Sequence, residues 1–139
     1  MRTFRENRAF TLIELIVVIV VVGVLAGLAV PRFSNTIEKS RIAEAINILA
    51  TLRDAQEVYK LENSAYTATV TNLDVTIPAS KNFMAPETTA GNPLAKIRRN
   101  ADGYDYTLTI DIDGTVKCTL GVAPADICTR LGCPSGVCN

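Results

Sequence analysis

The strongest pattern in the chain is an apolar stretch close to its start. Phe10–Val30 is apolar except for Thr11 and Glu14, and the sixteen residues from Leu15 to its end carry no charge. At a rise of about 1.5 Å per residue, a helix of this length spans roughly the hydrocarbon core of a bilayer. An ordinary signal peptide has a shorter apolar region that ends at a small-residue cleavage site, whereas this one runs on into Pro31. We therefore expect residues 10–30 to form a transmembrane helix, with the three arginines of residues 1–9 on the cytoplasmic side.

A second pattern, with a helical period, follows the apolar stretch. Its apolar positions recur at intervals of three and four residues, and they are Ile42, Ala45, Ile46, Leu49, Leu52 and Tyr59. The opposite side of this predicted helix is charged, with Glu38, Arg41, Glu44, Arg53, Glu57 and Lys60. The pattern ends at Asn63-Ser64. A helix that runs from the membrane to this point is too long to be buried in so small a domain, so its first half must be buried in lipid or in other subunits.

The remaining residues, Ser64–Asn139, are predicted to form loops and strands, and one hairpin can be recognised among them. Tyr104–Ile112 alternates between apolar and polar residues, and an Asp-Gly turn signal follows it. A three-residue loop, Ile112–Gly114, would pair Ile110 with Val116 and place its glycine in the left-handed conformation that such loops require. A two-residue loop would put the apolar sets of the two strands on different faces. The predicted fold is therefore α+β, a long N-terminal helix packed on a small antiparallel sheet.

Composition argues against several classes of function. The chain has no histidine, which is the commonest general base near neutral pH. No nucleophile–base pair, phosphate-binding loop or metal cluster can be assembled from the residues present, so we expect neither an enzyme nor a cofactor. Basic and acidic side chains balance at 14 each, which gives no general bias towards nucleic acid. The basic run Lys96, Arg98 and Arg99 is better explained as a solvated loop than as a contact with DNA, and no nucleic-acid partner is predicted.

The four cysteines lie within the last twenty-two residues, at Cys118, Cys128, Cys133 and Cys138. An even, clustered set of this kind is typical of an oxidising compartment outside the cytoplasm. Their spacing fits neither a zinc motif nor a haem motif, so two disulfides are expected. Of the three connectivities we favour Cys118 with Cys138 and Cys128 with Cys133. The pairing of Cys118 with Cys128 and Cys133 with Cys138 is nearly as good.

Two aspartates separated by one residue in the hairpin raise the possibility of a metal site. Asp111 and Asp113, followed by Gly114, resemble part of a calcium loop but lack its full spacing. Because the Asp-Gly pair is already explained as a turn, no metal site is predicted.

Glu14 is the one residue of the apolar stretch that needs a special explanation. A carboxylate inside an apolar membrane segment costs about 2.5–3.5 kcal/mol on insertion scales, unless it reaches the headgroup boundary or finds a partner. If the chain were cut after Ala9, Phe10 would gain a free amine one helical turn from Glu14. An amine of this kind on a neighbouring subunit could neutralise the carboxylate and set the axial register between the two chains.

The segment Arg8-Ala9-Phe10-Thr11-Leu12-Ile13-Glu14, followed by the apolar run and Pro31, resembles the N-terminal signature of type IV prepilins and pseudopilins. The resemblance implies that an inner-membrane aspartyl peptidase cuts before Phe10 and methylates the new amine. It also implies that Glu14 is needed for filament assembly, and that the helix around Gly23, Gly27 and Pro31 melts locally when filaments form. The spacing of Gly23 and Gly27 is by itself that of a pair that allows close helix packing, although glycine is also common in membrane helices for no such reason. One position departs from the signature, because Ala9 stands where the family usually has glycine.

The resemblance completes the functional prediction. Residues 1–9 would be a leader peptide, residues 10–30 a transmembrane and assembly helix, and residues 31–139 a periplasmic or extracellular head. The expected function is that of a structural subunit of a type IV pilus-like filament, because a disulfide-closed tail favours a pilin. A pseudopilin of a type II secretion system and a single-span binding module that never polymerises are the alternatives.

The expected partners follow from the same assignment. They are other copies of the chain, the prepilin peptidase, the assembly machinery of the inner membrane and, before assembly, membrane lipid. The expected location is the inner membrane and then an extracellular pilus or a periplasmic pseudopilus.

Overall fold

The structure is a computed structural model, and it describes residues 10–122 and 126–138, without the side chains of residues 28–35. Its longest element is the helix α1 (Leu12–Asn63), which includes 52 residues. The chain divides into two compact units between Ser34 and Asn35, and each is described by itself. Ala9 and the rest of the predicted leader lie outside the described residues, as does the side chain of Pro31.

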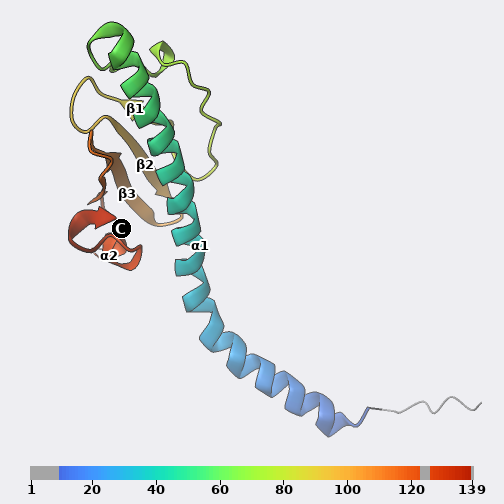
Figure 1. Ribbon diagram of the computed structural model, residues 1–139. Coiled ribbons are helices and arrows are strands. Elements are labelled where there is room, and N and C mark those ends of the chain that lie inside the picture. Colours follow the sequence, from blue (N-terminus) through green and yellow to red (C-terminus); the bar gives the residue numbers. More distant parts are fainter. Residues whose placement is uncertain (1–9, 123–125, 139) are drawn as a thin grey trace, which may run out of the picture. The chain divides into compact units, whose positions relative to one another are not determined.

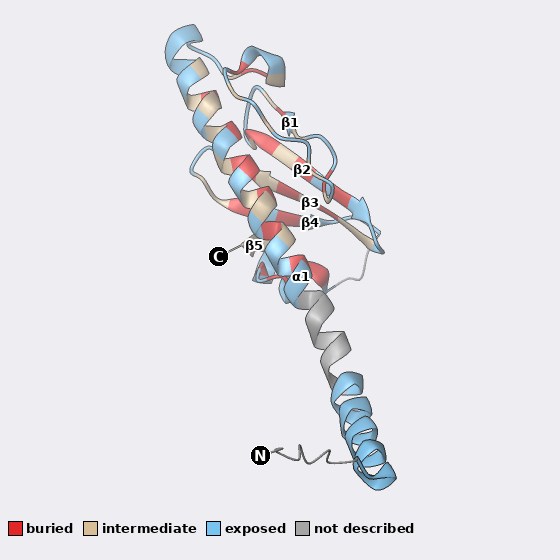
Figure 2. Ribbon diagram, turned by 90° about the vertical axis from the view of Figure 1, so that its right-hand side faces the viewer, coloured by how far each residue is buried: buried red, intermediate tan, exposed pale blue. Residues whose placement is uncertain are grey.

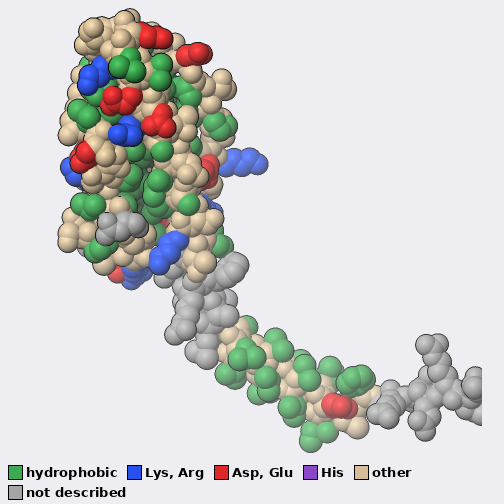
Figure 3. Space-filling view, viewed as in Figure 1, with side chains coloured by type: hydrophobic (Ala, Val, Ile, Leu, Met, Phe, Trp, Pro, Cys, Tyr) green, Lys and Arg blue, Asp and Glu red, His purple; other side chains and the backbone are tan. Residues whose placement is uncertain are grey.

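The first unit contains the start of α1 and exposes apolar side chains on all sides. Every large apolar residue of this unit that the structure describes is exposed, from Phe10 to Leu25, and Figure 3 shows these side chains gathered along the helix. Within the described part of the chain, no helix is both long enough and apolar enough to cross a membrane. The last three residues of the predicted span 10–30 have side chains outside the description.

The second unit, which we call the head, combines the rest of α1 with a five-stranded antiparallel sheet (Figure 1). The strands follow one another in sequence order, β1 (Glu87–Thr88), β2 (Ala95–Ala101), β3 (Tyr104–Ile110), β4 (Val116–Leu120) and β5 (Val137–Cys138). Short helical turns complete the unit, namely η1 (Val70–Asn72), α2 (Ile127–Arg130) and η2 (Pro134–Gly136). This is the α+β architecture that the sequence predicts.

The core lies between α1 and one face of the sheet. Figure 2 shows the buried side of α1 turned towards the buried positions of β2, β3 and β4. The helix contributes Ile42, Ala45, Leu49 and Leu52, and the sheet contributes Ile97, Leu108, Ile110 and Val116. Full burial of one such aliphatic side chain stabilises a fold by about 1.5–3 kcal/mol. The predicted apolar stripe of the helix is therefore confirmed, and α1 ends at Asn63 as predicted.

The register of the β3–β4 hairpin is also confirmed. Ile110 pairs with Val116, and Leu108 pairs with Cys118. The loop is closed by a hydrogen bond from the Asp111 N–H to the Thr115 carbonyl, and Gly114 has a φ of +88°. The left-handed conformation at the last loop residue is the reason that glycine is favoured there.

The basic run Lys96, Arg98 and Arg99 was predicted to be a solvated loop, and this prediction is wrong. These residues belong to β2, which pairs along its whole length with β3. Buried and open positions alternate along β2, so Lys96 and Arg98 lie on the open face while Arg99 points into the head. Strand preference depends more on cross-strand neighbours than on the residues themselves, and the pairing with Tyr104–Ile110 decides the outcome here.

The favoured disulfide pairing is wrong, and the second pairing is the one observed. Cys118 is bonded to Cys128, and Cys133 is bonded to Cys138. The reason lies in α2, which packs Ile127 and Cys128 into the core next to β4. The turn η2 then reverses the chain, so that β5 brings Cys138 back beside Cys133.

Candidate functional site

Thr11 is the cap of α1, and Glu14 is the third residue of the helix. The Thr11 hydroxyl oxygen accepts a hydrogen bond from the Glu14 N–H at 3.3 Å, and the same hydroxyl donates to the Glu14 carboxylate at 3.5 Å. A threonine followed three residues later by a glutamate is the spacing of a capping box. The cap satisfies one of the backbone N–H groups that a helix start leaves without a partner.

The capping role of Thr11 was not predicted from the sequence, although the Thr-x-x-Glu spacing is typical of a capped helix start. The cap places the Glu14 carboxylate in the first turn of α1, where the helix dipole favours a negative charge. In the described part of the chain, Glu14 has Thr11 as its hydrogen-bond partner and forms no ion pair. The carboxylate is therefore held in place by a neutral hydroxyl and remains open to a cation from outside the described residues.

The apolar surroundings of Glu14 define what such an outside partner must provide. Leu12 and Ile13 are 75% and 71% exposed, and the apolar side chains of the following turns are exposed as well. A helix that is apolar on all sides is stable only when lipid or other protein covers it.

Gly23 and Gly27 lie four residues apart, on one face of the same helix. A Cβ atom added to either glycine would have nothing within 4 Å, so neither glycine is required for packing among the described residues. They leave a place where another helix can approach the backbone closely. The structure therefore gives these residues no internal role, and their proposed role in assembly concerns contacts between chains.

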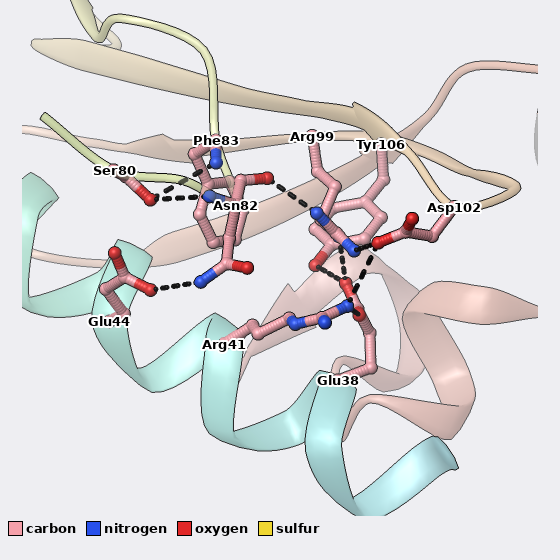
Figure 4. Close-up of polar contacts among 9 residues, drawn as sticks. All are labelled: Glu38, Arg41, Glu44, Ser80, Asn82, Phe83, Arg99, Asp102 and Tyr106. Carbon is pink, nitrogen blue, oxygen red and sulfur yellow. Dashed lines mark hydrogen bonds and ion pairs between the residues drawn. The ribbon is translucent and has the colours of Figure 1, made fainter.

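A second polar site lies inside the head, where Glu38 of α1 meets Arg99 of β2 and Tyr106 of β3 (Figure 4). The Glu38 Oε1 atom accepts hydrogen bonds from Arg99 Nε at 2.5 Å and from the Tyr106 hydroxyl at 2.8 Å. Glu38 and Tyr106 are 0% exposed and Arg99 is 1% exposed. The prediction that Glu38 lies opposite the apolar stripe is wrong, because this carboxylate joins α1 to two strands of the sheet.

The cluster continues outwards to Arg41 and Asp102. Arg41 donates to Glu38 Oε2 at 2.9 Å, so the predicted Glu38–Arg41 pair is present. Asp102, in the turn after β2, accepts from Arg99 Nη2 at 2.9 Å and from Arg41 at 3.5 Å. A third Arg99 bond runs to the Asn82 carbonyl at 2.7 Å. Each charge in the cluster therefore has an opposite partner, which is the condition under which buried charges are tolerated.

The protonation states in the cluster follow from burial and hydrogen bonding. Burial opposes the charge of Arg99, but its hydrogen bonds to Glu38 and Asp102 outweigh this effect and raise its pKa. Burial, followed by the hydrogen bond to Glu38, raises the pKa of Tyr106. Tyr106 therefore remains a hydroxyl donor, and Arg99 remains a cation.

Gln56 is a further buried polar residue that sequence analysis missed. Its amide nitrogen donates to the Thr67 carbonyl at 2.6 Å and to the Thr89 carbonyl at 3.3 Å, and its amide oxygen accepts from the Thr67 N–H at 3.0 Å. Gln56 is 0% exposed. It therefore fastens the loop after α1, together with the turn before β2, to the helix. Nothing local in the sequence marks this glutamine, since its partners are 11 and 33 residues away.

The aspartates of the hairpin serve the turn and the sheet. Asp111 forms an ion pair with Lys117, and Asp113 accepts a hydrogen bond from the Thr115 N–H at 2.9 Å. This bond is the main cause of the lowered pKa of Asp113. No group of three or more cysteine or acidic side chains that could hold a metal is found among the described residues.

The chain is similar to known proteins, both in its N-terminal segment and over most of its length. A family model described as the prokaryotic N-terminal methylation motif matches residues 4–30. The type II secretion system core protein G of Escherichia coli (strain K12) is 39% identical over 111 residues, which cover 78% of this chain and 75% of that protein. The protein of the same name from Klebsiella pneumoniae is 35% identical over 110 residues, or 75% of each chain. The one from Vibrio cholerae is 30% identical over 106 residues, which cover 76% of this chain and 73% of that protein.

Proposed function

Because the chain belongs to the family of the type II secretion system core protein G, we propose that it is a pseudopilin, a subunit that polymerises into the filament of a type II secretion system. This function is the alternative that the sequence analysis left beside a surface pilus. The pilin interpretation agrees with the comparisons only at the level of the wider family. The two tail disulfides do not favour the pilus, since they occur here in a chain whose relatives are secretion proteins.

The observation that carries the proposal is the helix start. A capped acidic residue, with no cation bound to it among the described residues, stands at the beginning of a helix that is apolar on all sides. Lipid alone would cover the apolar side chains but would supply no fixed cation for Glu14. A bundle of identical helices supplies both, because each neighbour brings an apolar surface and an N-terminal amine.

The proposed assembly begins with processing. The peptidase cuts between Ala9 and Phe10 while the chain is anchored in the inner membrane, and the amine of Phe10 is methylated. The amine keeps its positive charge after methylation and lies one helical turn from Glu14. Neighbouring chains then associate with the Phe10 amine of one against the Glu14 carboxylate of the other, which fixes how far each chain is displaced along the filament.

Gly23 and Gly27 have a part in this bundle, because they allow two helices to approach closely just beyond the charged pair. Pro31 is proposed to loosen the helix locally when the filament forms, since proline removes one backbone hydrogen bond. The heads would then coat the outside of the filament on the periplasmic side. Within each head, the Glu38–Arg99 cluster and Gln56 hold the sheet and the loops against α1 during this rearrangement.

The proposal is tested by replacing Glu14 in the full chain. We expect Glu14→Ala to remain in the membrane, to be cut normally and to form no filaments, measured by membrane fractionation, intact mass and electron microscopy of filaments. The matched control is Asp54→Ala, which removes an exposed carboxylate from the head part of the same helix. Normal filaments from Glu14→Ala would reject the mechanism, and an assembled protein that retains Met1 would reject the cleavage.

A further inference from the structure

Nearly all charged side chains of the head have a partner within the head. Among its described residues, four have neither an ion pair nor a side-chain hydrogen bond, and these are Lys39, Glu62, Asp74 and Lys81. All four are exposed. A protein that pairs its other charges internally leaves these four for solvent or for a second molecule.

The four free charges are separated by sign: the two cations lie nearer the start of the head part of α1, and the two anions lie near its end. Lys39 and Glu62 belong to α1 itself, whereas Lys81 and Asp74 follow it in the chain. Lys39 lies near the beginning of the head part of the helix. Lys81 immediately precedes Asn82, whose side chain donates to Glu44 at 2.9 Å and whose carbonyl accepts from Arg99. Figure 4 shows Asn82 between these two residues, close to the Glu38 cluster. Asn82 lies against Glu44, five residues after Lys39, so both free cations lie beside the first half of the head part of α1. We call this region the basic end.

The two free anions lie at the other end of the helix. Glu62 is the penultimate residue of α1, and it lines a hollow of about 230 Å³ together with Asp74. Lys39 and Glu62 are about 35 Å apart along the helix axis, at about 1.5 Å per residue. We call the region around Glu62 and Asp74 the acidic end.

Apolar side chains are uncovered beside the acidic end. Leu61 is 85% exposed and Val58 is 54% exposed, and they lie three residues apart on α1. A contact with another molecule would cover them, while the neighbouring carboxylates would require basic groups on that molecule.

We propose that the acidic end of one head docks on the basic end of another copy of this chain farther along the filament. The proposal rests on the filament function argued above and adds a contact between heads to the bundle of helices. Copies in a filament all point the same way, so two different ends of the head must meet, and such contacts form open helices. Opposite charges favour this head-to-tail contact, whereas two acidic ends would repel each other, so the same four residues also oppose reversed packing.

The test exchanges the signs of the two ends in the full chain. One variant carries Lys39→Glu with Lys81→Glu, a second carries Glu62→Lys with Asp74→Lys, and a third carries all four substitutions. We expect each of the first two to reduce the number of filaments about fivefold or more, as expected for the loss of exposed ion pairs that repeat at every subunit. The variant with all four changes should recover most of the loss, because the contact is restored with its signs exchanged.

Two controls separate this contact from other effects. Glu87→Lys reverses an exposed charge on β1 that belongs to neither end, and should leave the filaments unchanged. The thermal unfolding of the variants should equal that of the original chain, because none of the four side chains has an internal partner.

Two-site variants that assemble normally, or a four-site variant that assembles no better than they do, would overturn the proposal. If the original chain forms filaments that depend on Glu14, the proposed function stands whatever the charge exchange shows. If it forms none, both proposals fail.

Discussion

Two glutamates on the same helix, Glu14 and Glu38, have opposite surroundings. Glu14 is exposed among apolar side chains and is held by the Thr11 hydroxyl, without a cation in the described part of the chain. Glu38 is completely buried and is bonded to Arg99, Arg41 and Tyr106. A charge that finds its partners within the chain stabilises one fold. A charge that is placed precisely, but has no cation among the described residues, is available for the contact with another chain that we propose.

Replacement of Glu38 tests this comparison first, because it has the largest expected effect. Glu38→Ala should lower the free energy of unfolding of the head by about 3–5 kcal/mol, because it leaves the guanidinium of Arg99 charged and buried without its main partner. The measurement is denaturant unfolding of the full chain in detergent, followed by near-ultraviolet circular dichroism of the tyrosines. Glu14→Ala is the matched control and should change the same free energy by less than about 0.5 kcal/mol.

A double replacement separates the ion pair from simple loss of packing. Glu38→Leu combined with Arg99→Met removes both charges and keeps side chains of similar size. If the pair acts as described, the double variant should be more stable than Glu38→Leu alone. Additive losses would show that the two residues stabilise the head independently.

A second test concerns buried hydrogen bonding without charge. Gln56→Ala removes both carbonyl contacts and the acceptor of the Thr67 N–H, and should cost about 1–3 kcal/mol, because the partner groups are left buried and unpaired. Asn47→Ala, an exposed change on the same helix, serves as the control in the same unfolding experiment. An equal effect of the two substitutions would contradict the role given to Gln56.

A third test examines the cap beside Glu14. Thr11→Ala removes the capping hydroxyl, which typically costs a helix about 1 kcal/mol, and should reduce filament formation about fivefold. Thr11→Ser keeps the hydroxyl and should assemble normally. Intact-mass measurement must show that both variants are cut before Phe10, so that assembly and not processing is compared. Equal assembly of the alanine and serine variants would show that Glu14 needs no cap.

The smallest expected effect is on the pH dependence of the head. The hydrogen bonds from Arg98 and then from the Val122 N–H hold the pKa of Asp105 below its ordinary value of 3.8. A lowered pKa in the folded state contributes stability above the ordinary pKa, and this contribution is lost as the pH falls through the folded value. Asp105→Asn should therefore show a smaller loss of thermal stability than the original chain when the pH is lowered below about 4. Identical acid sensitivity of the two chains would contradict this assignment.

The sequence was sufficient for those parts of the fold that repeat with a regular period. The end of α1 at Asn63, its apolar stripe and the pairing of Ile110 with Val116 were all predictable, because each follows from periodicity or from the requirements of a short turn. The start of α1 was partly predictable. Glu14 was recognised, but the capping role of Thr11 was overlooked although its spacing is local.

The parts that could not be predicted depend on residues far apart in the chain. Glu38 looks like an ordinary surface charge, since its partner Arg99 is 61 residues away. Arg99 in turn lies in a basic run that becomes a strand only by pairing with β3. The disulfides depend on how α2 packs against β4, and the four cysteine positions carry no information about that packing.

The location of the two disulfides has a consequence for the order in which the molecule matures. Both bonds lie within residues 118–138, and neither includes α1. The helix and the central strands can therefore associate before any oxidant has acted, and the covalent step only completes the tail. A chain that reaches its compartment ahead of the oxidising enzyme would still have a folded centre, with a tail that remains open until the thiols are joined.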